Sequence, residues 1–185
     1  MIVIFRRYHY LYNLQIKMNN ELIYPSKSIK PIMKSFSNFP PPVNWRVENY
    51  YSNFEFIILL DDDRRITIQK DPDPRSNPID GNINIIEFLF NYPIAMDSNG
   101  NNLDWVHRFA DRINWIIPSG KVLVDNDKDI APNGVIWLKN SVNLKGGISN
   151  SWLREQFISF LKSMEFISNY HNAESNSPLM NGKWI

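Results

Sequence analysis

The alternation of apolar and polar side chains between residues 54 and 90 constrains the fold of this chain more than any other feature. Phe54–Leu60 is rich in aromatic and β-branched residues, and after three consecutive aspartates the alternation resumes at Ile66 and Ile68. A period of two places alternate side chains on one face of a strand, so these segments predict a hairpin with an acidic turn. Ile83–Phe90 repeats the signal. We therefore expect an antiparallel sheet that buries one face in a core.

Three segments have the spacing of helices that cover such a sheet. Pro31–Phe39 has apolar residues at helical spacing and a proline suited to the first turn. Leu103–Ile117 follows the i, i+3, i+7 spacing of an amphipathic helix. The last helix follows the Gly146-Gly147 break, with Ser149 or Ser151 as its N-cap. Its apolar stripe consists of Leu153, Phe157, Phe160, Leu161, Met164 and Ile167.

Short strands at Val122–Val124 and Val135–Leu138 complete the element order α-β-β-β-α-β-β-α. This order predicts an α+β fold, a two-layer sandwich in which helices pack on an antiparallel sheet of five to six strands. We expect a single domain over residues 18–172, followed by a polar C-terminal tail at 173–185. The three prolines between residues 71 and 80 predict an open loop.

The first seventeen residues have a composition of their own. They include Arg6 and Arg7, several aromatic residues and no acidic side chain. One interpretation is an organelle-targeting segment, although the serine richness and clean amphipathic spacing of such segments are missing. The other is a flexible extension upstream of a second start at Met18, which we favour. The expected location is the cytoplasm, or the plastid stroma if the segment is a targeting signal.

Charge, cysteine content and hydropathy exclude several classes of function. The formal net charge is +1, so no strong field attracts nucleic acid or an anionic membrane, and we expect neither as a partner. No cysteine is present, which excludes disulfides, zinc–thiolate sites and thiol nucleophiles. Apolar runs such as Phe56–Leu60 are far shorter than the about 20 residues that span a bilayer.

Several segments together resemble the YbjN-like domain. They are Ile86–Ile94, Ala110–Asn114, Pro118–Asp125 and Gly134–Leu138, followed by the amphipathic last helix. The resemblance covers roughly residues 43–172 and is strongest over 83–170. Members of that family are described as sensory-transduction regulators, and their fold is similar to that of type III secretion chaperones. The resemblance thus implies that the chain binds or chaperones another protein, and a cyanobacterial branch of the family makes a plastid or cyanobacterial source conceivable.

Metal-binding patterns are incomplete. Asp125, Asp127 and Asp129 have the acidic spacing that begins a calcium loop, but the positions that need glycine and glutamate hold Ile130 and Ile136. The stretch from Asp97 to Asn101 fails in the same way. We expect no metal and no cofactor.

Catalytic patterns are also missing. His9, His107 and His171 are far apart in the sequence, and Ser149 lacks a second flanking glycine and is better explained as a helix cap. The three aspartates at 61–63 should be hydrated at a hairpin tip rather than buried as an acid–base pair. We therefore expect no catalytic residues.

Aromatic content is the positive signal: aromatic residues make up 14% of the chain, six of them tryptophans. Four tryptophans cannot all lie on the stripes assigned to the core, and exposed Trp is a common anchor of protein interfaces. The candidate partner-binding residues are Trp105, Trp115, Trp137 and Trp152. The alternative is that they fill the edge of the core.

Three hypotheses of function remain. The favoured one is a non-enzymatic protein-binding module, a chaperone-like or regulatory adaptor that is a monomer or homodimer. The alternative is a structural subunit or assembly factor of a larger complex, for example in a plastid or cyanobacterium. The third is a small enzyme that uses Asp and His residues from distant segments, such as Asp125 with His107.

Overall fold

The computed structural model describes residues 21–37, 45–48, 52–73, 75, 81–93, 103–125 and 135–175. The expectations for residues 1–17 and for the Asp97–Asn101 pattern lie outside the described residues, as do Asp127 and Asp129 of the calcium-like pattern. Within the described part of the chain, no helix is long and apolar enough to cross a membrane.

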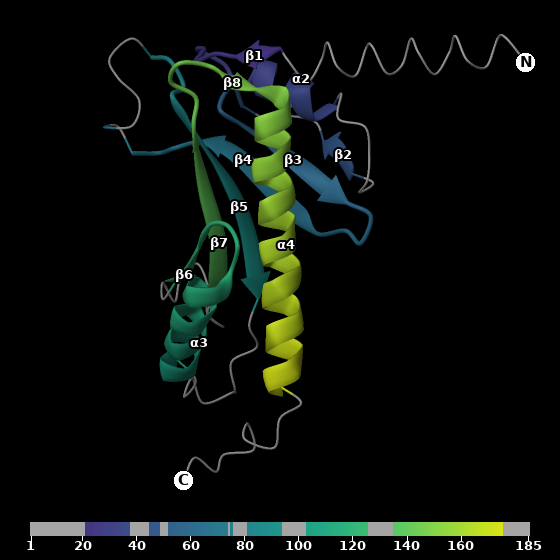
Figure 1. Cartoon of the computed structure of the whole chain (residues 1–185), viewed down its shortest axis with the longest axis vertical. Helices are drawn as coiled ribbons and strands as arrows, with labels where there is room; N and C mark the ends of the chain where they lie inside the picture. The colour runs from purple at the N-terminus through teal and green to yellow at the C-terminus, as the bar shows by residue number, and fades with distance from the viewer. Residues whose placement is uncertain are drawn as a thin grey trace, which may run out of the picture.

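The architecture is an antiparallel six-stranded sheet with helices on one face, as the alternation predicted (Figure 1). The strand order is β2-β3-β4-β5-β7-β6, and a second sheet pairs β1 with β8. The elements are β1 (Leu22–Ile23), α2 (Lys30–Ser37), β2 (Trp45–Glu48), β3 (Glu55–Leu60), β4 (Arg65–Lys70), β5 (Ile85–Pro93), α3 (Leu103–Ile116), β6 (Lys121–Asp125), β7 (Val135–Asn143), β8 (Ile148–Ser149) and α4 (Asn150–Ser175). The α+β prediction is confirmed, whereas the two-residue strands β1 and β8 were not predicted.

The acidic hairpin joins β3 to β4. The Leu60 amide donates to the Arg64 carbonyl at 2.9 Å, and Asp63 takes the left-handed conformation with φ 62°. Asp is one of the few residues that tolerate this conformation, so the aspartate run suits the turn. The Asp62 carboxylate pairs with Arg64 at 2.6 Å on the exposed tip.

Register decides which side chains enter the core. Ile66 and Ile68 of β4 lie opposite Phe90 and Phe88 of β5, and all four side chains are buried. The buried stripes of α2, α3 and α4 join these rows in one core cluster. The described helices thus pack on a single face of the sheet, which gives the two-layer arrangement.

Phe157 of α4 lies at the centre of this core. Its ring centroid lies 4.9 Å from that of Phe36 on α2, 5.3 Å from Trp45 on β2 and 5.5 Å from Phe88 on β5, each in an edge-to-face arrangement. Such pairs contribute about 0.5–1.5 kcal/mol each beyond the area they bury. One side chain therefore joins two helices and two strands.

Helix ends follow the expected signals. Ser149 caps α4, because its Oγ accepts the Trp152 amide at 3.2 Å. Gly146 and Gly147 both have φ 82°, so the predicted break before the helix is present. α4 continues to Ser175, into the segment 173–185 that composition predicted to be a polar tail. A helix that is already nucleated by a packed stripe extends through polar residues at little cost.

Phe157→Ala should lower the free energy of unfolding by about 3–5 kcal/mol, because the ring is fully buried and a cavity replaces four aromatic contacts. Chemical denaturation measures this loss. Phe166→Ala, on the same helix but only partly buried, is the matched control and should cost clearly less. Equal losses would show that Phe157 is not the centre of the core.

Gly120→Ala should destabilise the chain more than Gly146→Ala. Both glycines have a positive φ, but only at Gly120 would a Cβ meet the backbone, 2.7 Å from the Lys139 carbonyl oxygen, whereas nothing lies within 4 Å at Gly146. Strain alone should cost about 1–2 kcal/mol at Gly146, and the clash should add to that at Gly120. Thermal denaturation of the two variants tests this order, which equal midpoints would contradict.

Candidate protein-interaction surface

The four candidate tryptophans differ widely in exposure. Trp115 at the end of α3 is 89% exposed and Trp152 at the start of α4 is 40% exposed. Trp105 stacks on Phe109 with ring centroids 5.2 Å apart and belongs to the edge of the core. Trp137 is half-buried in β7. The four do not form one patch, since Figure 1 places the start of α4 at the top of the molecule and α3 at the lower left.

Asn114 fixes the end of α3 against β6. Its Nδ2 donates to the Val122 carbonyl at 2.9 Å and its Oδ1 accepts the Val122 amide at 2.6 Å. β6 is an edge strand of the large sheet, so the side chain of Asn114 takes the place of a neighbouring strand at this residue. The amide matches both backbone groups at once, as a peptide bond would.

The residues next to Asn114 and Val122 in the sequence are exposed and apolar. Trp115 and Ile116 follow Asn114, and Leu123 follows Val122; Ile116 is 50% and Leu123 39% exposed. On the face of the sheet away from the helices, Leu123 lies opposite Trp137 in the register of β6 and β7. We call Trp115, Ile116 and Leu123, which flank the Asn114–Val122 hydrogen bonds in the sequence, the α3–β6 surface. It contains Trp115, the most exposed of the four tryptophans that the sequence singled out.

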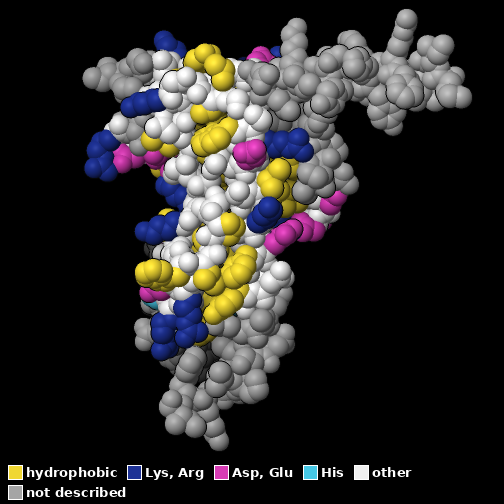
Figure 2. Space-filling view, viewed as in Figure 1, with side chains coloured by type: hydrophobic (Ala, Val, Ile, Leu, Met, Phe, Trp, Pro, Cys, Tyr) yellow, Lys and Arg dark blue, Asp and Glu magenta, His cyan; other side chains and the backbone are white. Residues whose placement is uncertain are grey.

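Charged side chains flank this surface. Arg108, Asp111 and Arg112 are exposed on α3, and Lys121 is exposed at the start of β6. Figure 2 shows a group of basic side chains over α3 and hydrophobic side chains interspersed along the helical face. An exposed aromatic residue rimmed by charged groups is the usual anatomy of a protein interface.

Glu87 is a buried charge that sequence reasoning missed. It lies on the face of the sheet away from the helices, yet only 1% of the residue is exposed. Lys139 of β7 forms an ion pair with it, and Gln69 Nε2 of β4 donates to it at 3.3 Å. The signal was present in the sequence as a glutamate inside an apolar strand. The Glu87 carboxylate links the three strands β4, β5 and β7 through these two contacts, and both of its oxygens are used in them.

Asp73, Arg75 and Tyr92 of the described chain have shifted pKa values, and the pKa of Arg75 is raised by its hydrogen bonds to Asp73. The pKa of the Asp73 carboxyl falls to about 2, because the Arg75 guanidinium and amide both donate to it in an exposed loop. Burial raises the pKa of Tyr92, and a hydrogen bond with Ser168 opposes this rise. The Tyr92 hydroxyl lies 3.0 Å from His171 Nδ1.

The suggested Asp125–His107 pair lies on two elements, Asp125 at the end of β6 and His107 on α3. Asp125 accepts a hydrogen bond from Trp137 Nε1 at 3.4 Å, and His107 is exposed on α3. Among the residues that the structure describes, no group of three or more His, Asp or Glu side chains is arranged to hold a metal ion.

Comparisons with known proteins give a match in structure alone. No family model matches the sequence. No curated relative matches it either. The crystal structure of YbjN from E. coli, described as "a putative transcription regulator", superposes with a TM-score of 0.60 at 11% sequence identity, covering 84% of this chain and 97% of that one. An identity this low shows the fold and nothing finer, and the chain has a YbjN-like fold, as its sequence pattern predicted.

Proposed function

We propose that this chain is a regulatory adaptor that binds a partner protein through the α3–β6 surface and catalyses no reaction. The observation that carries the proposal is Trp115, which is 89% exposed on a helix whose end Asn114 holds in place. A large aromatic side chain on a rigid element offers contact area at a small cost in conformational entropy. Such residues supply most of the binding energy at interfaces.

The fold comparison supports a regulatory role as a hypothesis. The matched protein is described as "a putative transcription regulator". With a net charge of +1, this chain has little of the electrostatic attraction to phosphates that dominates affinity for DNA. Regulation through contact with another protein therefore suits this chain better than direct binding of nucleic acid.

Trp115→Ala should abolish most of the affinity for the partner and leave the fold intact. Truncating a central interface tryptophan costs about 2 kcal/mol or more, which corresponds to a loss of about 30-fold in Kd. The free energy of unfolding should change by less than about 0.5 kcal/mol, because the side chain is exposed. The measurement begins with cross-linking of the full chain in its source extract, and titration calorimetry with the purified partner follows.

Trp152→Ala is the matched control, an exposed tryptophan on another helix. Its affinity should stay within about two- to threefold of that of the unmodified chain. Equal losses at both positions, or none at either, would refute the assignment of the surface. Sedimentation velocity distinguishes a second copy of the chain from a different protein as the partner.

Asn114→Ala should weaken the same surface from within. Two hydrogen bonds to Val122 are lost, which should cost about 1–3 kcal/mol of stability, and the Val122 amide should lose its protection against hydrogen exchange. Asn169→Ala, an exposed asparagine on α4, is the control and should change neither quantity. An unchanged exchange rate at Val122 would show that the Asn114 side chain does not hold β6 in solution.

A further inference from the structure

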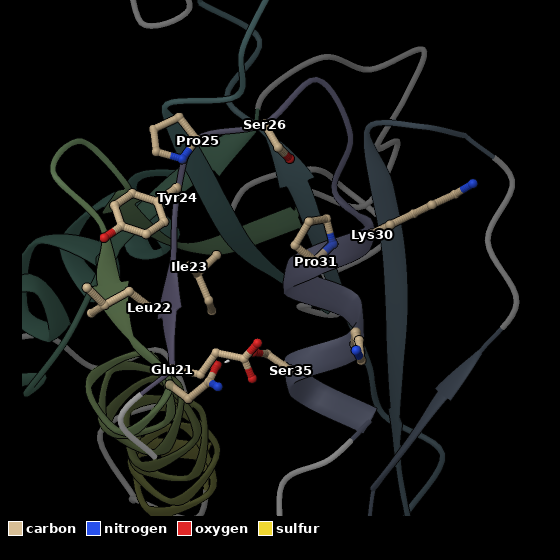
Figure 3. A pocket seen from close by; sticks show the side chains of 11 residues that line it. Glu21, Leu22, Ile23, Tyr24, Pro25, Ser26, Lys30, Pro31 and Ser35 are labelled. Atoms are coloured by element: carbon tan, nitrogen blue, oxygen red, sulfur yellow. Dashed lines mark hydrogen bonds between the residues drawn. The ribbon is translucent and has the colours of Figure 1, made fainter. Parts of the chain in front are cut away.

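A cavity of about 760 Å³ lies between β1 and α2, away from the α3–β6 surface. Figure 3 shows the extended segment Glu21–Ser26 along one wall and α2, with Lys30 and Pro31 in its first turn, along the other. Asn150, the first residue of α4, closes one end, and its Oδ1 accepts a hydrogen bond from Ser35 Oγ. Both residues are buried. Two separate segments of the chain thus enclose a defined space.

One edge of β1 has no strand beside it among the residues that the structure describes. Ile23 lies opposite Ile148, and Leu22 opposite Ser149, while the Glu21 carbonyl accepts the Asn150 amide at 3.2 Å. In an antiparallel pair, the residues that exchange hydrogen bonds alternate with residues whose backbone groups point the other way. Glu21 and Ile23 face β8, so the amides and carbonyls of Leu22 and Tyr24 face away from it. No described residue forms a backbone hydrogen bond with Leu22 or Tyr24 on that side.

The same edge is already used for pairing at its far end. Two residues beyond Tyr24, the Ser26 carbonyl accepts the Ile83 amide at 2.7 Å, in an antiparallel bridge. From Ile85 onward the chain pairs with β4 and β7 in the large sheet. The open positions at Leu22 and Tyr24 therefore continue an edge that accepts strand pairing.

Side chains around this edge alternate between the cavity and the outside. Figure 3 shows Ile23 pointing across the cavity toward α2, whereas Leu22 and Tyr24 point the other way. Leu22 is 47% and Tyr24 57% exposed. A strand added to this edge would alternate in the same way. Every second side chain of that strand would enter the cavity beside Ile23, and the others would contact Leu22 and Tyr24.

The charge of the opposite wall defines which side chains fit. Residues 22–37 contain Lys27, Lys30 and Lys34 and no acidic residue. Glu21, directly before this segment, is the single negative charge beside these three positive charges. Lys30 and Lys34 are one helical turn apart and line the cavity. Within the described chain, neither ammonium group forms an ion pair. Figure 3 shows Lys30 extending away from the Glu21–Ser26 segment, and this exposed side chain can turn toward a carboxylate that projects into the cavity. Such carboxylates would give these lysines partners.

We propose that the β1–α2 cavity binds an acidic segment of a partner protein as an added β-strand. Backbone hydrogen bonds to Leu22 and Tyr24 hold the strand, and Lys30 and Lys34 select alternate acidic side chains. Addition of a strand at a free edge combines affinity from the backbone with specificity from side-chain pockets. This site is separate from the α3–β6 surface, so either one stands if the other fails.

The probe is a short acetylated peptide in which glutamate and valine alternate, titrated into the full chain. A Kd of up to about 1 mM is expected for such a short strand. Hydrogen exchange at the Leu22 and Tyr24 amides should become slower when the peptide is bound. Lys30→Glu combined with Lys34→Glu should weaken binding about tenfold at low salt. The change at Lys30 adds an acidic group in the first turn of α2, where it favours the helix, whereas Lys34 lies in the last turn, where a glutamate opposes the helix dipole. Both side chains are exposed, and circular dichroism of the double variant checks that the fold is retained.

Four controls make the result decisive. Lys162→Glu, an exposed lysine on α4, should leave the peptide affinity unchanged, and so should Trp115→Ala. A peptide that alternates lysine and valine, or an acidic one with N-methylated valines, should not bind. The proposal is overturned if the acidic peptide fails to bind below about 1 mM, or if it binds without protecting Leu22 and Tyr24. It is equally overturned if the lysine reversals have no effect.

Discussion

The packing of Phe157 is the contact on which the rest of this structure depends. Its ring meets α2, β2 and β5 at once, and Phe36 of α2 packs on Phe56 and Phe88 of the sheet beside it. The cavity beside β1 exists because α2 is held there, and α4 begins at Asn150 in the floor of that cavity. A single aromatic cluster thus sets both the core and the wall that carries Lys30 and Lys34.

The sequence predicted the strands and helices in which apolar residues recur at a regular spacing, and it missed the elements too short to show such a spacing. Ile66, Ile68 and Phe88 fall on one face because a strand alternates, so the large sheet was readable from spacing alone. β1 and β8 have two residues each and come together from more than a hundred positions apart. No window of local sequence contains that pairing, and for this reason the cavity was not predictable.

Exposure of single side chains was equally hard to predict. The sequence singled out Trp105 and Trp115 on one helix as candidate binding residues, but could not separate the partly buried one from the exposed one. Trp105 stacks on Phe109 and lies near His171 of α4, whereas no packing partner covers Trp115 in the described chain. The difference comes from where α4 crosses α3, which is a tertiary property. Glu87 illustrates the same limit, because its burial results from Lys139 and Gln69 on neighbouring strands.

The edge strands β6 and β1 expose their backbone groups to different extents. At β6 the side chain of Asn114 occupies the backbone groups of Val122, which blocks the addition of a strand at that residue. At β1 no residue of the described ranges covers the backbone groups of Leu22 and Tyr24 in this way. Lysines beside an edge are a common protection against self-association, since two copies would bring like charges together. At β1 these lysines leave the backbone groups accessible, so the same charges that repel a second copy would attract an acidic strand.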